Sequence, residues 1–100
     1  MGHELLRIQR HALLLAMSST QRVAHFLLEM CSRLEQGDVL TLPMTRQDIA
    51  DHLGLTIETV SRAVSQFKTR GLIETRHLGE VVVLRDRDAL RRVCEGERVY

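Results

Sequence analysis

A mainly α-helical fold with a small β component (α+β) is predicted for this chain of 100 residues. Three observations support it. Apolar residues recur at helical spacing through most of the chain. Gly54 marks a sharp turn between two such helical segments near the middle. The stretches 72–76 and 80–84 then flank a turn at 77–79, which predicts a β-hairpin. A chain of this length suits one small domain.

The first predicted helix covers residues 4–17, and residues 1–3 are set aside as a candidate cloning scar. Its apolar residues at coiled-coil spacing are Leu5, Ile8, Ala12 and Leu15. Two heptads are too few for a stable coiled coil alone. The helix either packs on its own domain or is the tail of a longer dimerisation helix whose start is missing. We favour the second interpretation, because the run 13–15 adds more apolar surface than one edge needs.

The main domain is predicted over 18–95, and its first helix runs from about Thr20 to Glu35 after a cap in 18–20. The apolar stripe of this helix consists of Val23, Phe26, Leu27, Met30, Cys31 and Leu34. This pattern predicts a core helix with Cys31 as a buried thiol and His25 as a half-buried structural histidine. A turn at 36–38 and a short strand at 39–42 follow.

The centre of the chain, 46–65, reads as two short helices joined by the turn at Gly54. Thr45 and Thr56 are the predicted caps of these helices, and Asp48 completes a capping box with Thr45. The first helix carries Ile49, Ala50 and Leu53 on one face. The inward stripe of the second helix, about Thr56–Arg70, is Val60, Ala63, Val64 and Phe67. Its outward stripe is Glu58, Ser61, Arg62 and Ser65.

Together with the hairpin, or wing, this layout predicts a winged helix-turn-helix, in which the second helix enters the major groove of DNA. Asp86 is predicted to cap a last helix over 87–95, with Ala89, Leu90 and Val93 inward, before a tail at 96–100. A plain helical hairpin without nucleic acid remains an alternative interpretation of the same two helices.

The outward stripe has the chemistry for reading bases. An arginine can contact guanine through two hydrogen bonds, a glutamate can accept from cytosine, and a serine hydroxyl can meet either base type. Arg62, Glu58 and Ser61 are therefore the candidate base-reading residues. Glu58 and Arg62 are also four residues apart, so they could pair with each other on the helix surface. The two interpretations are compatible.

Charge and composition favour binding to double-stranded DNA over binding to single-stranded nucleic acid or RNA. The net charge is only +1, but the segment 59–73 carries Arg62, Lys68 and Arg70 and no acid, which favours one basic face on a near-neutral body. Scarce aromatic residues weaken a single-stranded nucleic acid or RNA interpretation.

Other chemistry is not indicated. Phosphate-binding glycine loops, catalytic triads and metal-ligand spacings are lacking in the sequence, so no enzyme, cofactor or metal site is predicted. Cys31 and Cys94 lie far apart, and Cys94 could be exposed. Unpaired thiols and the lack of a signal peptide or spanning segment predict a cytoplasmic protein.

The run TRQDIADHLGLTIETVSR, followed by GLIE and a short hairpin, resembles the carboxy-terminal domain of the Crp/Fnr family of bacterial transcription regulators. The resemblance covers about Thr20 to Val93. The order E-T-V-S-R at 58–62 is similar to the Fnr and FixK branch. The family implies a winged helix-turn-helix that binds double-stranded DNA for transcription regulation.

The resemblance also implies roles for single residues. Glu58, Ser61 and Arg62 would read bases in a palindrome with TTGA-like half-sites. The implied phosphate contacts are Thr45, Arg46, Gln47, Thr56, Thr59 and His77. A homodimer is implied for the full-length protein, and RNA polymerase is a candidate partner through the loop 35–38. The sensory domain of the family is not in these residues, so the signal stays undetermined. The alternative is a winged-helix protein–protein module without DNA binding, which the acidic Glu58 leaves open.

Overall fold

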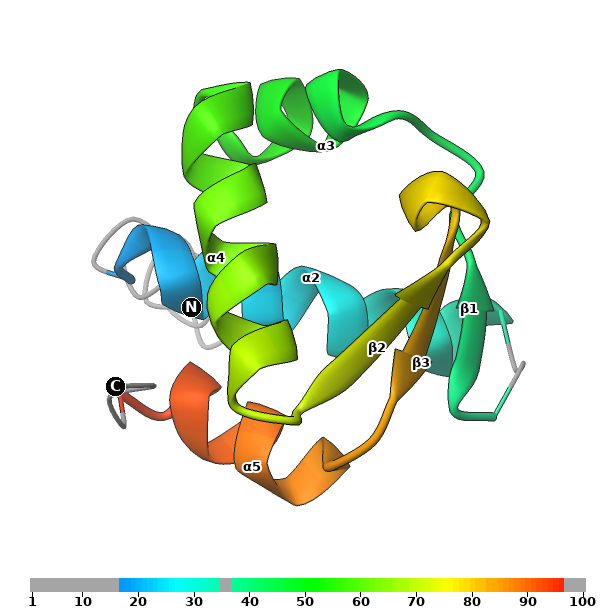
Figure 1. The fold of residues 1–100 in the computed structure, drawn as a ribbon. Helices are drawn as coiled ribbons and strands as arrows, with labels where there is room; N and C mark the ends of the chain where they lie inside the picture. The colour runs from blue at the N-terminus through cyan, green and yellow to red at the C-terminus, as the bar shows by residue number, and fades with distance from the viewer. Residues whose placement is uncertain (1–16, 35–36, 97–100) are drawn as a thin grey trace, which may run out of the picture.

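The computed structural model describes residues 17–34 and 37–96. Within these residues, four α-helices, three strands and one 3-10 turn follow in the order α2 (Ser19–Leu34), β1 (Val39–Thr41), α3 (Arg46–Leu53), α4 (Ile57–Thr69), β2 (Ile73–Arg76), the turn His77–Gly79, β3 (Val81–Leu84) and α5 (Arg87–Cys94) (Figure 1). This arrangement confirms the predicted α+β fold. The predicted helix over residues 4–17 lies outside the described residues, apart from Met17.

A reciprocal pair of hydrogen bonds defines the start of α2. The Ser18 hydroxyl accepts from the Gln21 backbone N–H at 3.2 Å, and the Gln21 side-chain oxygen accepts from the Ser18 N–H at 2.7 Å. These bonds satisfy two backbone donors that the first turn of a helix leaves without partners. The helix therefore begins one residue before the predicted start, within the predicted cap.

The strands form one antiparallel sheet in the order β1-β3-β2. The predicted hairpin is present, with Ile73 opposite Leu84 and Arg76 opposite Val81. The other edge of β3 pairs with β1, where Leu40 lies opposite Val82, and both side chains have no exposed surface. The strand before the helix-turn-helix thus becomes the third strand of the wing's sheet, a partner that the sequence analysis did not assign.

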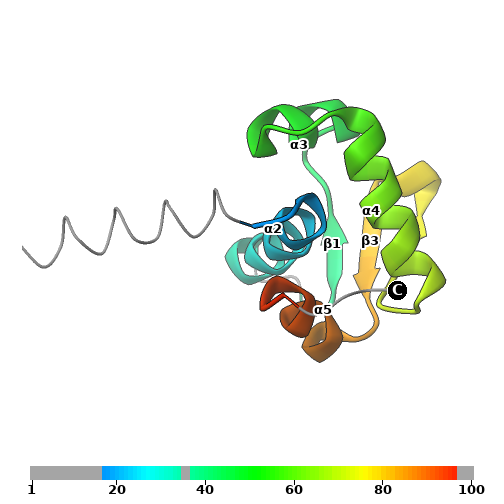
Figure 2. The same cartoon turned by 90° about the vertical axis from the view of Figure 1, so that its left-hand side faces the viewer.

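The core lies where α2 packs against α4, α5 and β1. Figure 2 shows α3 over one end of the domain and α5 under the other, with α2 between them. Phe67, on α4, is fully buried, and the rest of the predicted stripe is buried with it. Leu53 and Ala89, which were predicted to face inward, are only partly buried at the edge of the core. None of the described helices is long and apolar enough to cross a membrane.

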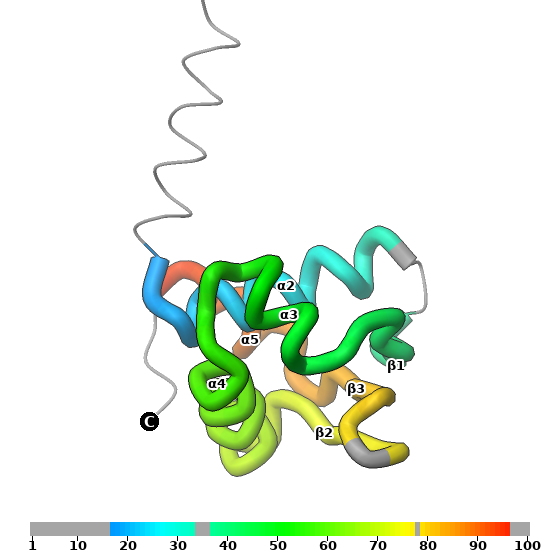
Figure 3. Tube along the Cα trace, turned by 90° about the horizontal axis from the view of Figure 1, so that it is seen from above, coloured from blue at the N-terminus to red at the C-terminus, as the bar shows by residue number. Residues whose placement is uncertain are grey.

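Figure 3 shows that α4 and the hairpin lie on the same side of the molecule, with α2 and α5 behind them. The helices α2 and α5 therefore support α4 from behind, and the side with α4 and the hairpin faces away from them (Figure 3).

His25 on α2 is half-buried, as predicted, and its Nδ1 lies 3.6 Å from a carboxylate oxygen of Glu29.

Cys94 is half-buried at the end of α5, which corrects the suggestion that it could be exposed. Burial raises the pKa of its thiol to about 11, from 9.0 for an ordinary thiol. Because the thiolate is the nucleophile, we expect native Cys94 to react with iodoacetamide at pH 8 roughly a hundredfold more slowly than free cysteine.

The reaction of Cys94 should accelerate about tenfold per pH unit towards pH 11, because the thiolate fraction rises with pH. Mass spectrometry of timed samples measures it, and unfolding in guanidinium provides the control in which Cys31 and Cys94 both react quickly. Rapid addition of one alkyl group to the native chain at pH 8 would contradict the burial of Cys94.

Candidate nucleic-acid interface

The first helix of the helix-turn-helix is capped as predicted. The Thr45 hydroxyl accepts from the Asp48 N–H at 3.1 Å, and the Asp48 carboxylate accepts from the Thr45 N–H at 3.3 Å. At the other end Gly54 has φ +71°, a conformation that a side chain disfavours. The next residue, Leu55, donates its N–H to Ala50 at 2.8 Å and so closes the turn. These local bonds set where α4 begins.

Thr56 caps α4, as predicted, by accepting from the Thr59 N–H at 3.2 Å. The two threonine hydroxyls are also 2.8 Å apart and share a hydrogen bond. Below them, the inward stripe of α4 is buried against the core, while Glu58, Ser61, Arg62 and Ser65 are exposed. Packing on one side therefore holds a polar face towards solvent on the other.

Glu58 and Arg62 do not pair with each other in the structure. Neither residue takes part in any ion pair or side-chain hydrogen bond found among the described residues. The charges of both side chains are therefore available to a ligand.

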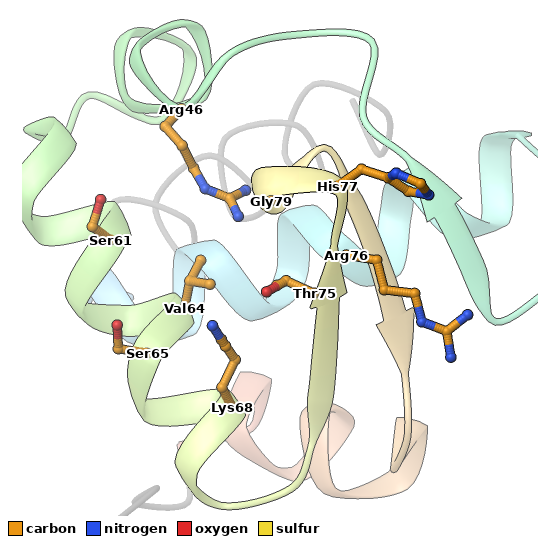
Figure 4. Close-up of a pocket in the computed structure, with 9 residues that line it drawn as sticks. All are labelled: Arg46, Ser61, Val64, Ser65, Lys68, Thr75, Arg76, His77 and Gly79. Atoms are coloured by element: carbon orange, nitrogen blue, oxygen red, sulfur yellow. The ribbon is translucent and has the colours of Figure 1, made fainter.

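A groove of about 390 Å³ runs between α4 and β2, up to the wing turn (Figure 4). Its lining residues are Arg46, Ser61, Val64, Ser65, Lys68, Thr75, Arg76, His77 and Gly79. The guanidinium of Arg46 reaches across from the start of α3, and its Nη2 lies 3.0 Å from where a Cβ on Gly79 would be. Gly79 also has φ +91°. Glycine adopts this backbone conformation readily, and a side chain in its place would push against the end of the arginine.

The basic side chains that line the groove differ in where they point and in whether they form an ion pair. In Figure 4 the side chains of Arg46 and Lys68 point into the groove, whereas those of Arg76 and His77 point away from it. Arg76 pairs with Glu74 at 3.2 Å. Hydrogen bonds from Arg85 and Arg76 lower the pKa of the Glu74 carboxyl, so this carboxylate stays ionised and offsets their charge. The interior of the groove is therefore left with Arg46 and Lys68.

The structure separates the predicted contact residues into groups. The base-reading candidates share the exposed face of α4. Thr45, Arg46 and Gln47 lie at the start of α3, where the Gln47 amide donates to Asp51 at 2.9 Å. Thr56 and Thr59 lie at the start of α4, and His77 occupies the wing turn with φ +53°.

Lys68 and Thr75 point polar side chains into the groove and were not among the predicted contacts (Figure 4). Lys68 follows Ser65 by three residues, so extending the outward stripe by one turn would have included it. Thr75 carries no comparable signal, because its position depends on where β2 packs beside α4. Within the described ranges, no group of three or more metal-ligating side chains is present.

The capped helix pair, the buried inward stripe and the hairpin in a three-stranded sheet define a winged helix-turn-helix domain. The family of Crp-like helix-turn-helix domains matches residues 21–93, and the chain belongs to it. This result confirms the predicted Crp/Fnr membership, and with it the class of DNA-binding transcription regulators.

Known relatives agree with this assignment. The nitrogen fixation regulation protein FixK of Rhizobium meliloti (strain 1021) is 46% identical over 89 residues, which cover 88% of this chain and 42% of that protein. The fumarate and nitrate reduction regulatory protein of Escherichia coli (strain K12) is 32% identical over 85 residues, which cover 81% and 33%. This chain thus spans less than half the length of these relatives. They are regulators, a class that acts without catalysis.

Solved structures show the same domain. FixK2 from Bradyrhizobium japonicum superposes with a TM-score of 0.81 at 43% identity, over 97% of this chain and 49% of that chain. The CO-dependent transcription factor CooA from Carboxydothermus hydrogenoformans gives 0.70 at 28% identity, over 77% and 37%. The similarity to FixK2 agrees with the FixK-like motif at 58–62.

Proposed function

We propose that this chain is the effector domain of a Crp/Fnr-type regulator and binds a TTGA-like palindrome by placing α4 in the major groove. The observation that carries this proposal is the face of α4. Glu58, Ser61 and Arg62 are exposed along one side of a helix whose opposite side is locked into the core. A rigid helix with unpaired polar groups on its outer side suits direct readout of bases.

The three side chains have complementary base preferences. Arg62 can donate two hydrogen bonds to O6 and N7 of guanine, Glu58 can accept from N4 of cytosine, and Ser61 can donate or accept. A TTGA half-site with its complementary strand offers both guanine and cytosine. The lack of a Glu58–Arg62 ion pair favours this role, since both groups are free to meet bases.

Phosphates of the DNA backbone are assigned to residues at the helix starts and the wing. The proposed contacts are Thr45, Arg46, Gln47, Thr56, Thr59 and His77. Backbone N–H groups at a helix start and nearby polar side chains suit an anion. Because the Thr56 and Thr59 hydroxyls already bond to each other, a phosphate would accept from only one of them. His77 is the weakest member of this set, since its side chain points away from the groove (Figure 4).

The remaining assignments concern the longer protein. Residues 1–17 would continue a dimerisation helix, because a palindrome matches a two-fold protein. A homodimer in the full-length cytoplasmic regulator follows, and RNA polymerase is proposed as a partner through the loop 35–38. These proposals rest on the family, and the two regulators compared above are more than twice as long as this chain.

A salt titration tests the DNA-binding proposal. Fluorescence anisotropy of the whole chain with a TTGA palindrome and with random DNA should show tighter binding to the palindrome at every salt concentration. Both affinities should fall as salt rises, because counterions leave the phosphates on binding. Equal affinity for the two duplexes would contradict sequence-specific recognition. No binding to either would favour a protein–protein module.

A further inference from the structure

We propose that the groove between α4 and β2 holds one phosphate of the DNA backbone through Arg46, Lys68 and the hydroxyl of Thr75. This inference rests on the proposed function and adds two residues, Lys68 and Thr75, to the contacts with DNA. It also gives Arg46 a specific position, over the wing turn, rather than a general role at the start of α3.

Arg46 is a partly buried cation that has no counter-charge among the described residues. Its side chain is half-buried, and burial lowers the pKa of the guanidinium because water is partly removed around the charge. None of the ion pairs or side-chain hydrogen bonds within 17–34 and 37–96 includes it. A desolvated charge without a counter-charge costs free energy, and a phosphate with its acceptor oxygens would remove that cost.

Lys68 and Thr75 line the groove on its other two sides. Lys68 projects from α4 and Thr75 from β2, and both side chains point into the same space as Arg46 (Figure 4). Val64, which is only 6% exposed, also lines the groove. Two cations and a hydroxyl donor around one opening match a tetrahedral anion with several acceptor oxygens.

The position of the groove favours a phosphate of DNA over a free anion. Ser61 and Ser65 line the groove and also belong to the outward stripe of α4. A duplex whose bases meet Arg62 would bring a sugar–phosphate strand along this edge of the helix, between α4 and the wing. The groove is thus continuous with the face proposed to read bases.

The first test compares Lys68→Gln with the matched control Arg70→Gln. Both remove one positive charge near the end of α4, but Arg70 does not line the groove. We expect Lys68→Gln to weaken binding to the palindrome and to random DNA by the same factor. It should also reduce the slope of log affinity against log salt by about 1. Arg70→Gln should reduce the slope by clearly less, because Arg70 adds only to the general charge of the basic face, and thermal melts check that both variants fold.

The second test identifies the phosphate. Single methylphosphonate groups, which carry no charge, replace the phosphates of the palindrome one at a time. One position should weaken binding by the wild-type chain more than it weakens binding by Lys68→Gln, because in the variant only Arg46 and Thr75 still contact that phosphate. If no position behaves in this way, the groove does not hold a DNA phosphate. Competition by inorganic phosphate at fixed ionic strength, without such a position, would assign the groove to a free anion and overturn the proposal.

The outcomes distinguish a failure of the groove proposal from a failure of the proposed function. A wild-type chain that prefers the palindrome, with Lys68→Gln and Arg70→Gln showing the same salt slope, overturns the groove proposal and leaves base reading intact. A wild-type chain without preference for the palindrome overturns the proposed function itself.

Discussion

Phe67→Ala is expected to lower the free energy of unfolding by about 3–5 kcal/mol. Phe67 has no exposed surface and is the largest of the fully buried side chains. Its ring lies on the inner side of α4, so its removal leaves a cavity between this helix and the core. Small domains have a total stability of about 5–15 kcal/mol. The variant should therefore lose a large share of its stability.

Urea unfolding followed by circular dichroism measures the effect of Phe67→Ala. Thr69→Ala, at an exposed position of the same helix, is the control, and its effect should stay within about 0.5 kcal/mol. For a domain of this size the expected loss corresponds to a fall in melting temperature of more than about 10 °C. A shift of one or two degrees would show that Phe67 is not central to the core.

Arg62→Ala is expected to weaken specific DNA binding by about 1–3 kcal/mol and to relax the preference for guanine in the half-site. Arg62 is exposed near the middle of the outward stripe of α4 and makes no ion pair within the described part of the chain. Because it packs against nothing in the core, the substitution should leave the fold and its melting temperature unchanged.

Arg46→Ala provides the contrast to Arg62→Ala. As a phosphate contact, Arg46 should affect all sequences about equally, and its loss should reduce the salt slope by about 1. Both variants are measured on a TTGA palindrome, on a palindrome with the guanine changed, and on random DNA. If Arg62→Ala weakens all three to the same degree, Arg62 is only a positive charge and the assignment of the recognition face is wrong.

Much of the fold follows from signals a few residues apart. The caps at Thr45, Thr56 and Asp86 each bond to a backbone N–H three residues on, as the residue types predict. Gly54 turns the chain at the predicted place because only a residue without a side chain accepts that φ readily. The buried stripe of α4 likewise follows from helical periodicity alone.

Contacts between distant segments could not be predicted in the same way. The pairing of β1 with β3 joins residues about forty positions apart, and no local pattern specifies it. Whether Glu58 and Arg62 pair was also open, since their spacing allows an ion pair but exposed pairs are weak enough to separate. The half-burial of Cys94 depends on how α5 packs against α2.

The sequence by itself determined the class of fold, the helix boundaries to within one or two residues, the exposed polar face of α4 and membership of the Crp/Fnr family. These features depend on periodicity, caps and turns, which act over a few residues. Only the tertiary structure decided the third strand of the sheet and the groove that brings Arg46, Lys68 and Thr75 together. These three residues come from three different elements, and they meet only because packing of α4 against the core and β2 sets the distance between them.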